Sequence, residues 1–112
     1  MSKTVYNKLV RDRIPEIIRA NGEVANFRVV ESRAEYLAAL LAKILEESAE
    51  VRIAVESEDP VEIAKEIADV REVLDAIAAE FAIPIEEVER IQTELREKRG
   101  GFSERIFLES TE

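Results

Sequence analysis

Apolar residues recur at helical spacing over two long stretches in the middle of the chain. The first covers residues 37–55 and the second residues 63–81, with an apolar side chain every three or four positions. Ser32 opens a capping-box pattern, a hydroxyl followed by a glutamate three residues later, which predicts a helix start there. Between the stretches, Asp59 is a good N-cap and Pro60 a good first residue for the next helix. We therefore expect two long helices, antiparallel across a short loop.

Shorter elements flank this central pair. A helix is predicted from Asp12, as its N-cap, to about residue 20, where Asn21-Gly22 stops it. Residues 23–31 read as a loop or a short extended segment, and residues 85–99 as a last helix that ends at two glycines. The tail, residues 102–108, is predicted to be a short strand or a strapping segment. The expected fold is one all-α domain over residues 1–112, a helical bundle with two long central helices.

Composition narrows the chemistry that this domain can perform. The 112 residues are 46% hydrophobic and 37% charged, which indicates a folded chain. Cysteine and histidine are both absent, which excludes disulfides, thiolate or imidazole metal sites and histidine-based catalysis. Any metal would be held by oxygen, the ligand that magnesium, manganese and calcium prefer. The net charge of −9 disfavours a nucleic-acid-binding protein.

The sequence also argues against a membrane protein. No apolar run reaches the roughly 18 residues that a transmembrane helix needs. The first residues, MSKTVYNKLVRDR, have no apolar stretch after their basic side chains and do not resemble a secretion signal. We expect a cytoplasmic protein with no membrane partner.

Two acidic pairs accompany the apolar stripes of the long helices. Glu47 and Glu50 are three residues apart on the first helix, and Glu66 and Asp69 on the second. On a helical wheel, Glu47 lies at the margin of its stripe, whereas Glu66 falls within an apolar arc. In an antiparallel pair the four carboxylates could meet, repel one another and require a divalent cation. Alternatively, with 21 glutamates in the chain, such pairs arise by chance on a solvated face.

A longer pattern includes these acids. Glu46-Glu47-Ser48-Ala49-Glu50, then fifteen residues, then Glu66-Ile67-Ala68-Asp69 matches E-E-x-x-E…E-x-x-D. The pattern resembles the MazG-like all-α nucleoside-triphosphate pyrophosphohydrolase superfamily, which includes the phosphoribosyl-ATP pyrophosphohydrolases. Residues 6–18, 66–77 and 98–108 are similar to a subgroup described as phosphoribosyl-ATP pyrophosphohydrolase-like or house-cleaning NTP pyrophosphatases.

The resemblance implies Mg²⁺-dependent hydrolysis, with Mn²⁺ as a second choice, of a nucleoside triphosphate to a monophosphate and pyrophosphate. It assigns the metal to Glu47, Glu50, Glu66 and Asp69, and makes Glu46 an auxiliary acid that orients or deprotonates the attacking water. Glu46 and Glu47 are thus the expected catalytic residues. It also implies a bundle completed by oligomerisation, as a homodimer or homotetramer. The apolar stripes point to the same conclusion, because two short helices can hardly cover two long stripes.

Two other functions stay open. One is the phosphoribosyl-ATP diphosphatase reaction of histidine biosynthesis, whose enzymes usually carry an S-Y-T segment where this chain has residues 27–35. That difference favours the house-cleaning reading. The other is a non-catalytic helical module for dimerisation or nucleotide sensing. It is disfavoured because such a module has no reason to keep four mutually repelling carboxylates.

Basic residues concentrate at the two ends of the chain. Residues 1–20 hold five bases against two acids and residues 96–105 four against two, whereas residues 31–95 hold six against eighteen. The terminal bases are therefore candidates for binding substrate phosphates. They are Lys8, Arg11, Arg13, Lys98, Arg99 and Arg105. The alternatives are stabilisation of a helix C-terminus and ion pairing across a subunit interface.

Overall fold

The computed structural model describes residues 2–112, and its regular elements within that range are all helices. In chain order they are α1 (Ile14–Ala20), α2 (Arg33–Ser57), α3 (Pro60–Glu80) and α4 (Ile85–Arg99). The all-α prediction is confirmed. The chain divides into two compact units, residues 1–77 and 78–112, with the boundary inside α3. None of the described helices is both long and apolar enough to cross a bilayer.

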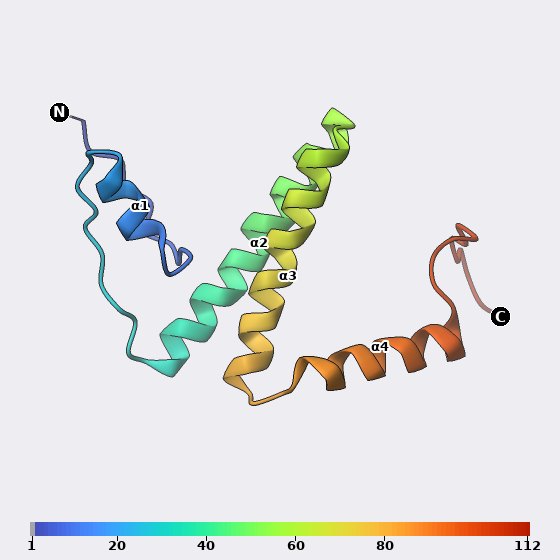
Figure 1. Ribbon diagram of the computed structural model, residues 1–112. Coiled ribbons are helices and arrows are strands. Elements are labelled where there is room, and N and C mark those ends of the chain that lie inside the picture. The colour runs from blue at the N-terminus through green and yellow to red at the C-terminus, as the bar shows by residue number, and fades with distance from the viewer. Residues whose placement is uncertain (1) are drawn as a thin grey trace. The chain divides into compact units, whose positions relative to one another are not determined.

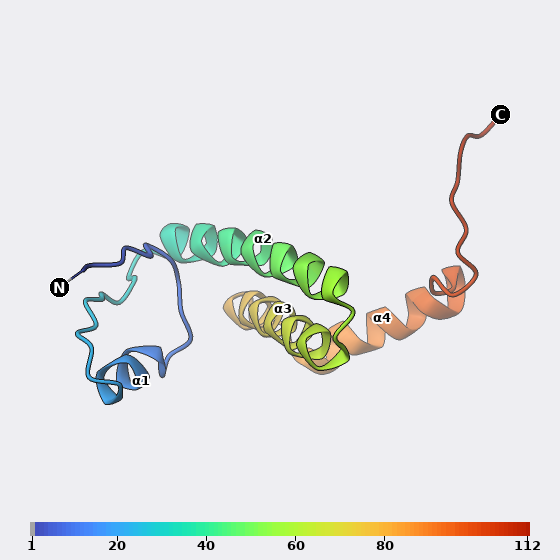
Figure 2. The same cartoon turned by 90° about the horizontal axis from the view of Figure 1, so that it is seen from above.

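Helices α2 and α3 form an antiparallel pair that lies side by side in both views (Figures 1 and 2). Ser32 caps α2 as predicted, since its hydroxyl accepts a hydrogen bond from the Glu35 N–H at 3.2 Å. Glu58 ends α2 in the left-handed region with φ 57°. Asp59 then caps α3 by accepting from the Val61 N–H at 3.0 Å. The tight turn between them makes the two helices reverse direction.

Up to residue 77, the buried residues of this pair follow one line along each helix. On α2, Leu40, Glu47 and Ala54 are buried at intervals of seven residues, which is two helical turns. On α3, Glu66 and Val73 are buried at the same interval. Two carboxylates thus occupy positions that belong to the core between the helices. Glu47 was predicted to lie only at the margin of the apolar stripe, so its burial is deeper than predicted.

Much of the apolar surface of the pair stays exposed. Leu41, Leu45 and Ile53 of α2 are more than half exposed, with Leu45 at 75%, and Ile67 and Leu74 of α3 are nearly half exposed. Among the described residues no large side chain is fully buried. The apolar arc of each helix is therefore wider than the face that the other helix covers. Oligomerisation stays a prediction that this surface favours.

The start of α1 differs from the prediction. Its N-cap residue is Arg13, which makes no side-chain capping bond, so the prediction of Asp12 as the cap is wrong. The reason is a backbone turn in which the Ile14 N–H donates to the Arg11 carbonyl at 3.0 Å, satisfying a group that a capping side chain would otherwise serve. The predicted stop at Asn21-Gly22 is confirmed, with Asn21 as C-cap and Gly22 at φ 83°.

Two segments without helix connect to these elements. Residues 23–31 form a loop, where the Arg19 guanidinium lies 5.5 Å from the Phe27 ring centre and Arg28 pairs with Glu35.

In the second unit, α4 ends at Gly100 with φ 82°, as predicted. The tail has a turn in which the Arg105 N–H donates to the Phe102 carbonyl at 3.1 Å, and no strand. Of the two alternatives for residues 102–108, the strand is wrong, because the described residues contain no second strand to pair with it. The strapping segment stays a prediction.

Candidate functional site

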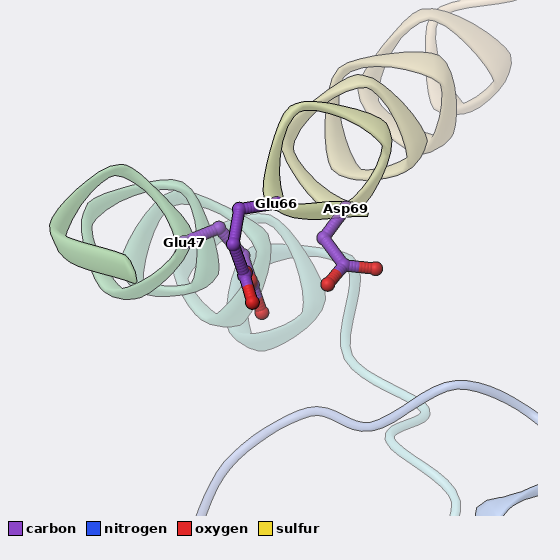
Figure 3. Close-up of side chains that lie close together, drawn as sticks. All are labelled: Glu47, Glu66 and Asp69. Carbon is purple, nitrogen blue, oxygen red and sulfur yellow. The ribbon is translucent and has the colours of Figure 1, made fainter. Parts of the chain in front are cut away.

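Three carboxylates from the central helix pair converge on one point. One oxygen each from Glu47 of α2 and from Glu66 and Asp69 of α3 lie within 4.8 Å of one another. All three side chains project to the same side of the helix pair (Figure 3). Glu47 and Glu66 come from the facing core lines, and Asp69 follows Glu66 by about one turn. The predicted meeting of the two helices' acids therefore occurs for three of the four residues.

The fourth predicted acid does not join this group. Glu50 is exposed on α2, one turn beyond Glu47, and is outside the cluster of three. Its role as a metal ligand stays a prediction.

Burial makes the repulsion within the cluster costly. Glu47 and Glu66 are only 9% and 8% exposed, and like charges in such surroundings destabilise each other more strongly than in water. Basic side chains offset part of this cost. Arg11 Nη2 lies 2.7 Å from Asp69, Lys43 Nζ 3.4 Å from Glu47, and Lys65 Nζ 3.6 Å from Glu66. Each carboxylate of the cluster has one cationic neighbour.

Glu46 lies beside the cluster and has its own partners. Lys8 donates a hydrogen bond to its carboxylate at 2.6 Å, and Lys43 Nζ is 3.6 Å from its other oxygen. The hydrogen bond from Lys8 is the main reason that the pKa of Glu46 is below its usual range. The same bond raises the pKa of Lys8. Glu46 is therefore ionised throughout the neutral pH range.

Lys43 is a site residue that sequence analysis missed. Its side chain is 16% exposed and bridges Glu46 and Glu47 on the same helix. A lysine three and four residues before two glutamates ordinarily forms weak surface ion pairs. The signal that could have singled it out is its position next to the buried line through Leu40 and Glu47.

The predicted phosphate-binding bases have different surroundings. Lys8 and Arg11 contact acids of the central helices, whereas Arg13 pairs locally with Glu16 at 3.0 Å. Lys98 and Arg99 are exposed in the last turn of α4, where the helix dipole favours bases, and Arg105 is exposed in the tail. Substrate binding by all six stays a prediction.

The donors of the cluster fit a hard divalent cation. Three carboxylates within one ion's reach are the oxygen ligands that Mg²⁺, Mn²⁺ and Ca²⁺ prefer. The partly buried carboxylates would also gain most from a concentrated positive charge. Glu47, Glu66 and Asp69 are thus the residues of this chain that could hold such an ion.

Antiparallel helices with facing carboxylates agree with the class expected from the sequence, the MazG-like all-α NTP pyrophosphohydrolases. The chain belongs to the phosphoribosyl-ATP pyrophosphohydrolase family of that superfamily, since residues 15–96 match the family described under that name. The resemblance is therefore confirmed. The match includes Glu46, Glu47, Glu66 and Asp69, but begins after Arg11.

A curated relative matches a smaller part of the chain. It is a protein of Mycolicibacterium smegmatis (strain ATCC 700084 / mc(2)155), described as an uncharacterized protein, and is 57% identical over 47 residues. The matched segment covers 42% of this chain and 47% of the relative, so the match spans about half the length of the curated relative. No solved structure matches the chain significantly.

Proposed function

We propose that this protein is a divalent-metal-dependent nucleoside-triphosphate pyrophosphohydrolase that releases a nucleoside monophosphate and pyrophosphate. The observation that carries the proposal is the convergence of Glu47, Glu66 and Asp69 within 4.8 Å, two of them buried. Membership in a pyrophosphohydrolase family supports the same reaction class. If the cluster were only a structural ion-pair network, burying like charges at the helix interface would bring no benefit.

In this proposal Glu47, Glu66 and Asp69 hold Mg²⁺ or Mn²⁺, with Glu50 as a fourth ligand. When bound, the ion would neutralise charge on the phosphate oxygens as the anhydride bond breaks. Glu46, held by Lys8 and Lys43, orients the attacking water or takes its proton, with Glu47 as the second catalytic residue.

The proposed substrates are nucleotides removed from the cellular pool, canonical or damaged, in a cytoplasmic setting. The second candidate is phosphoribosyl-ATP diphosphatase, the activity named in the description of the matched family. The two reactions share the bond cleaved and the metal, and differ in the nucleotide accepted. The geometry of the acids supports both equally.

Product analysis with a nucleotide panel tests the proposal. The purified chain is incubated with Mg²⁺ and canonical triphosphates, oxidised or deaminated triphosphates, or phosphoribosyl-ATP. We expect a monophosphate and pyrophosphate from at least one of them. Release of orthophosphate alone, or no turnover of any nucleotide, would refute the proposed reaction. Preference for phosphoribosyl-ATP would select the second candidate.

We also propose that the folded protein is a dimer or a tetramer of this chain. The exposed apolar residues Leu41, Leu45 and Ile53 of α2 line a face that a second α2–α3 pair can cover, giving the four helices of a closed bundle. Sedimentation at micromolar concentration should give a mass of two or four chains. Leu45→Glu should shift the population toward single chains, whereas Val24→Glu, an exposed residue of the loop, should not. A single-chain mass for the wild type would contradict the proposal.

A further inference from the structure

The segment before α1 brings two cations to acids that are remote in sequence. We define residues 7–13 as the N-terminal strap. Its Lys8 contacts Glu46, 38 residues away, and its Arg11 contacts Asp69, 58 residues away. Asn7, in the left-handed region at φ 45°, turns the chain just before Lys8. The carbonyl of Arg11 is held in the turn that precedes α1.

The strap lies beside a part of α2 that carries short side chains. Asn7, Lys8 and Leu9 line a small crevice together with Ala39 and Ala42 of α2. Leu9 is half-buried, whereas the Arg11 side chain is 55% exposed. The backbone of the strap is thus anchored while the guanidinium has room to change partners.

We propose that Arg11 and the metal ion exchange places at Asp69, and that the released Arg11 binds a substrate phosphate. This inference rests on the proposed function. Asp69 Oδ1 accepts from Arg11, and Asp69 also belongs to the metal-ligand group. A divalent ion on this carboxylate neutralises the charge that holds the guanidinium. The planar guanidinium then offers paired donors, a geometry that matches phosphate oxygens.

The exchange makes phosphate binding depend on the metal. Without the ion, Arg11 is occupied by Asp69, and the carboxylates of the cluster repel a phosphate. With the ion, two of the three negative charges of the cluster are compensated, and the guanidinium released from Asp69 is available to a phosphate. Lys8 stays with Glu46, which is outside the cluster of three, and keeps the strap in place. The strap precedes residues 15–96, which match the family.

Calorimetric titration of Mg²⁺ without nucleotide tests the first half of the exchange. Arg11→Gln removes the competing charge, so we expect it to bind Mg²⁺ about two- to fivefold more tightly, the range of an exposed ion pair. Arg52→Gln is the control, because Arg52 is exposed on α2, pairs with Glu56 at 3.3 Å and is not among the predicted phosphate-binding bases. It removes the same charge and should leave the affinity unchanged.

Binding of a triphosphate analogue with a methylene between the α and β phosphorus tests the second half. At saturating Mg²⁺ we expect Arg11→Gln to weaken the analogue about tenfold or more, as for a hydrogen bond between charged groups. Without Mg²⁺ the same substitution should have no larger effect than Arg52→Gln. A similar loss with and without the ion would overturn the exchange, because Arg11 would then bind phosphate independently of Asp69.

A measurement on the wild-type chain avoids any effect of the substitutions on folding. The Arg11 Nε–H resonance, assigned by its loss in Arg11→Gln or from through-bond spectra of the wild type, should shift as Mg²⁺ is added. A resonance that stays fixed while Mg²⁺ binds would overturn the exchange and leave the proposed function intact. If the wild type binds no Mg²⁺ and hydrolyses no nucleotide, the proposed function fails and the exchange fails with it.

Discussion

Glu66→Gln should weaken Mg²⁺ binding by about a hundredfold or more, and activity at low Mg²⁺ should fall with it. Even substitutions in the outer shell of metal sites cost about ten- to a hundredfold, so loss of a direct carboxylate ligand should cost at least as much. Glu66 is buried within the cluster of Glu47 and Asp69, so water cannot easily replace its oxygen. Calorimetric titration of Mg²⁺ and of Mn²⁺ measures the effect.

The stability of the metal-free protein distinguishes a metal ligand from a residue that serves only as a structural ion-pair partner. Removing one of three converging charges relieves repulsion, so metal-free Glu66→Gln should unfold at the same temperature as the wild type or higher. The control is Glu72→Gln, an exposed acid of the same helix outside the cluster. Unchanged Mg²⁺ affinity in Glu66→Gln, or lower metal-free stability, would show that Glu66 serves folding instead of metal binding.

Glu46→Gln should lower kcat by about a hundred- to ten-thousand-fold, the contribution of a positioned general acid or base. Glu46 is about 100° from Glu47 around α2, and lies outside the cluster of three. Mg²⁺ affinity should therefore stay within a few-fold of the wild type. Steady-state kinetics at saturating Mg²⁺, combined with calorimetry, measure both quantities on the same preparation.

The matched control for Glu46→Gln is Glu56→Gln. Glu56 is an exposed acid of α2 that pairs with Arg52 at 3.3 Å and lies outside the cluster. If metal binding is lost before turnover in Glu46→Gln, Glu46 is a direct ligand. If both quantities equal those of the control, Glu46 is a surface acid, and Glu47 would have to serve the attacking water.

Local signals in the sequence predict the helices well. Ser32, Asp59 and Gly100 act through bonds or dihedral angles within a few residues, so their effect can be read without tertiary structure. The same reasoning was wrong at Asp12, where a backbone turn competed with the side-chain cap. Of its two alternatives for the tail, the strand was wrong, because a strand depends on a partner that local sequence does not reveal.

The site was predicted in part, for a physical reason. On a helical wheel, the middle of the apolar stripe of α2 is the middle of all its apolar residues. Helix α3 covers only one side of that stripe, and Glu47 lies on the covered side. The contacts of Lys8 and Arg11 join residues 38 and 58 positions apart, so no local pattern encodes them. Only the three-dimensional path of the strap determines which base meets which acid.

Burial of Glu47 and Glu66 at core positions has a consequence for the lifetime of the protein in the cell. An ion that binds only the native state stabilises it by about 1.4 kcal/mol for each tenfold rise in free ion above its dissociation constant. On the proposed function, the folded population would then follow the supply of free magnesium. Chains made during magnesium starvation would open more often and be degraded sooner by proteases. The abundance of the enzyme would thus be adjusted to the availability of the ion without a dedicated regulator.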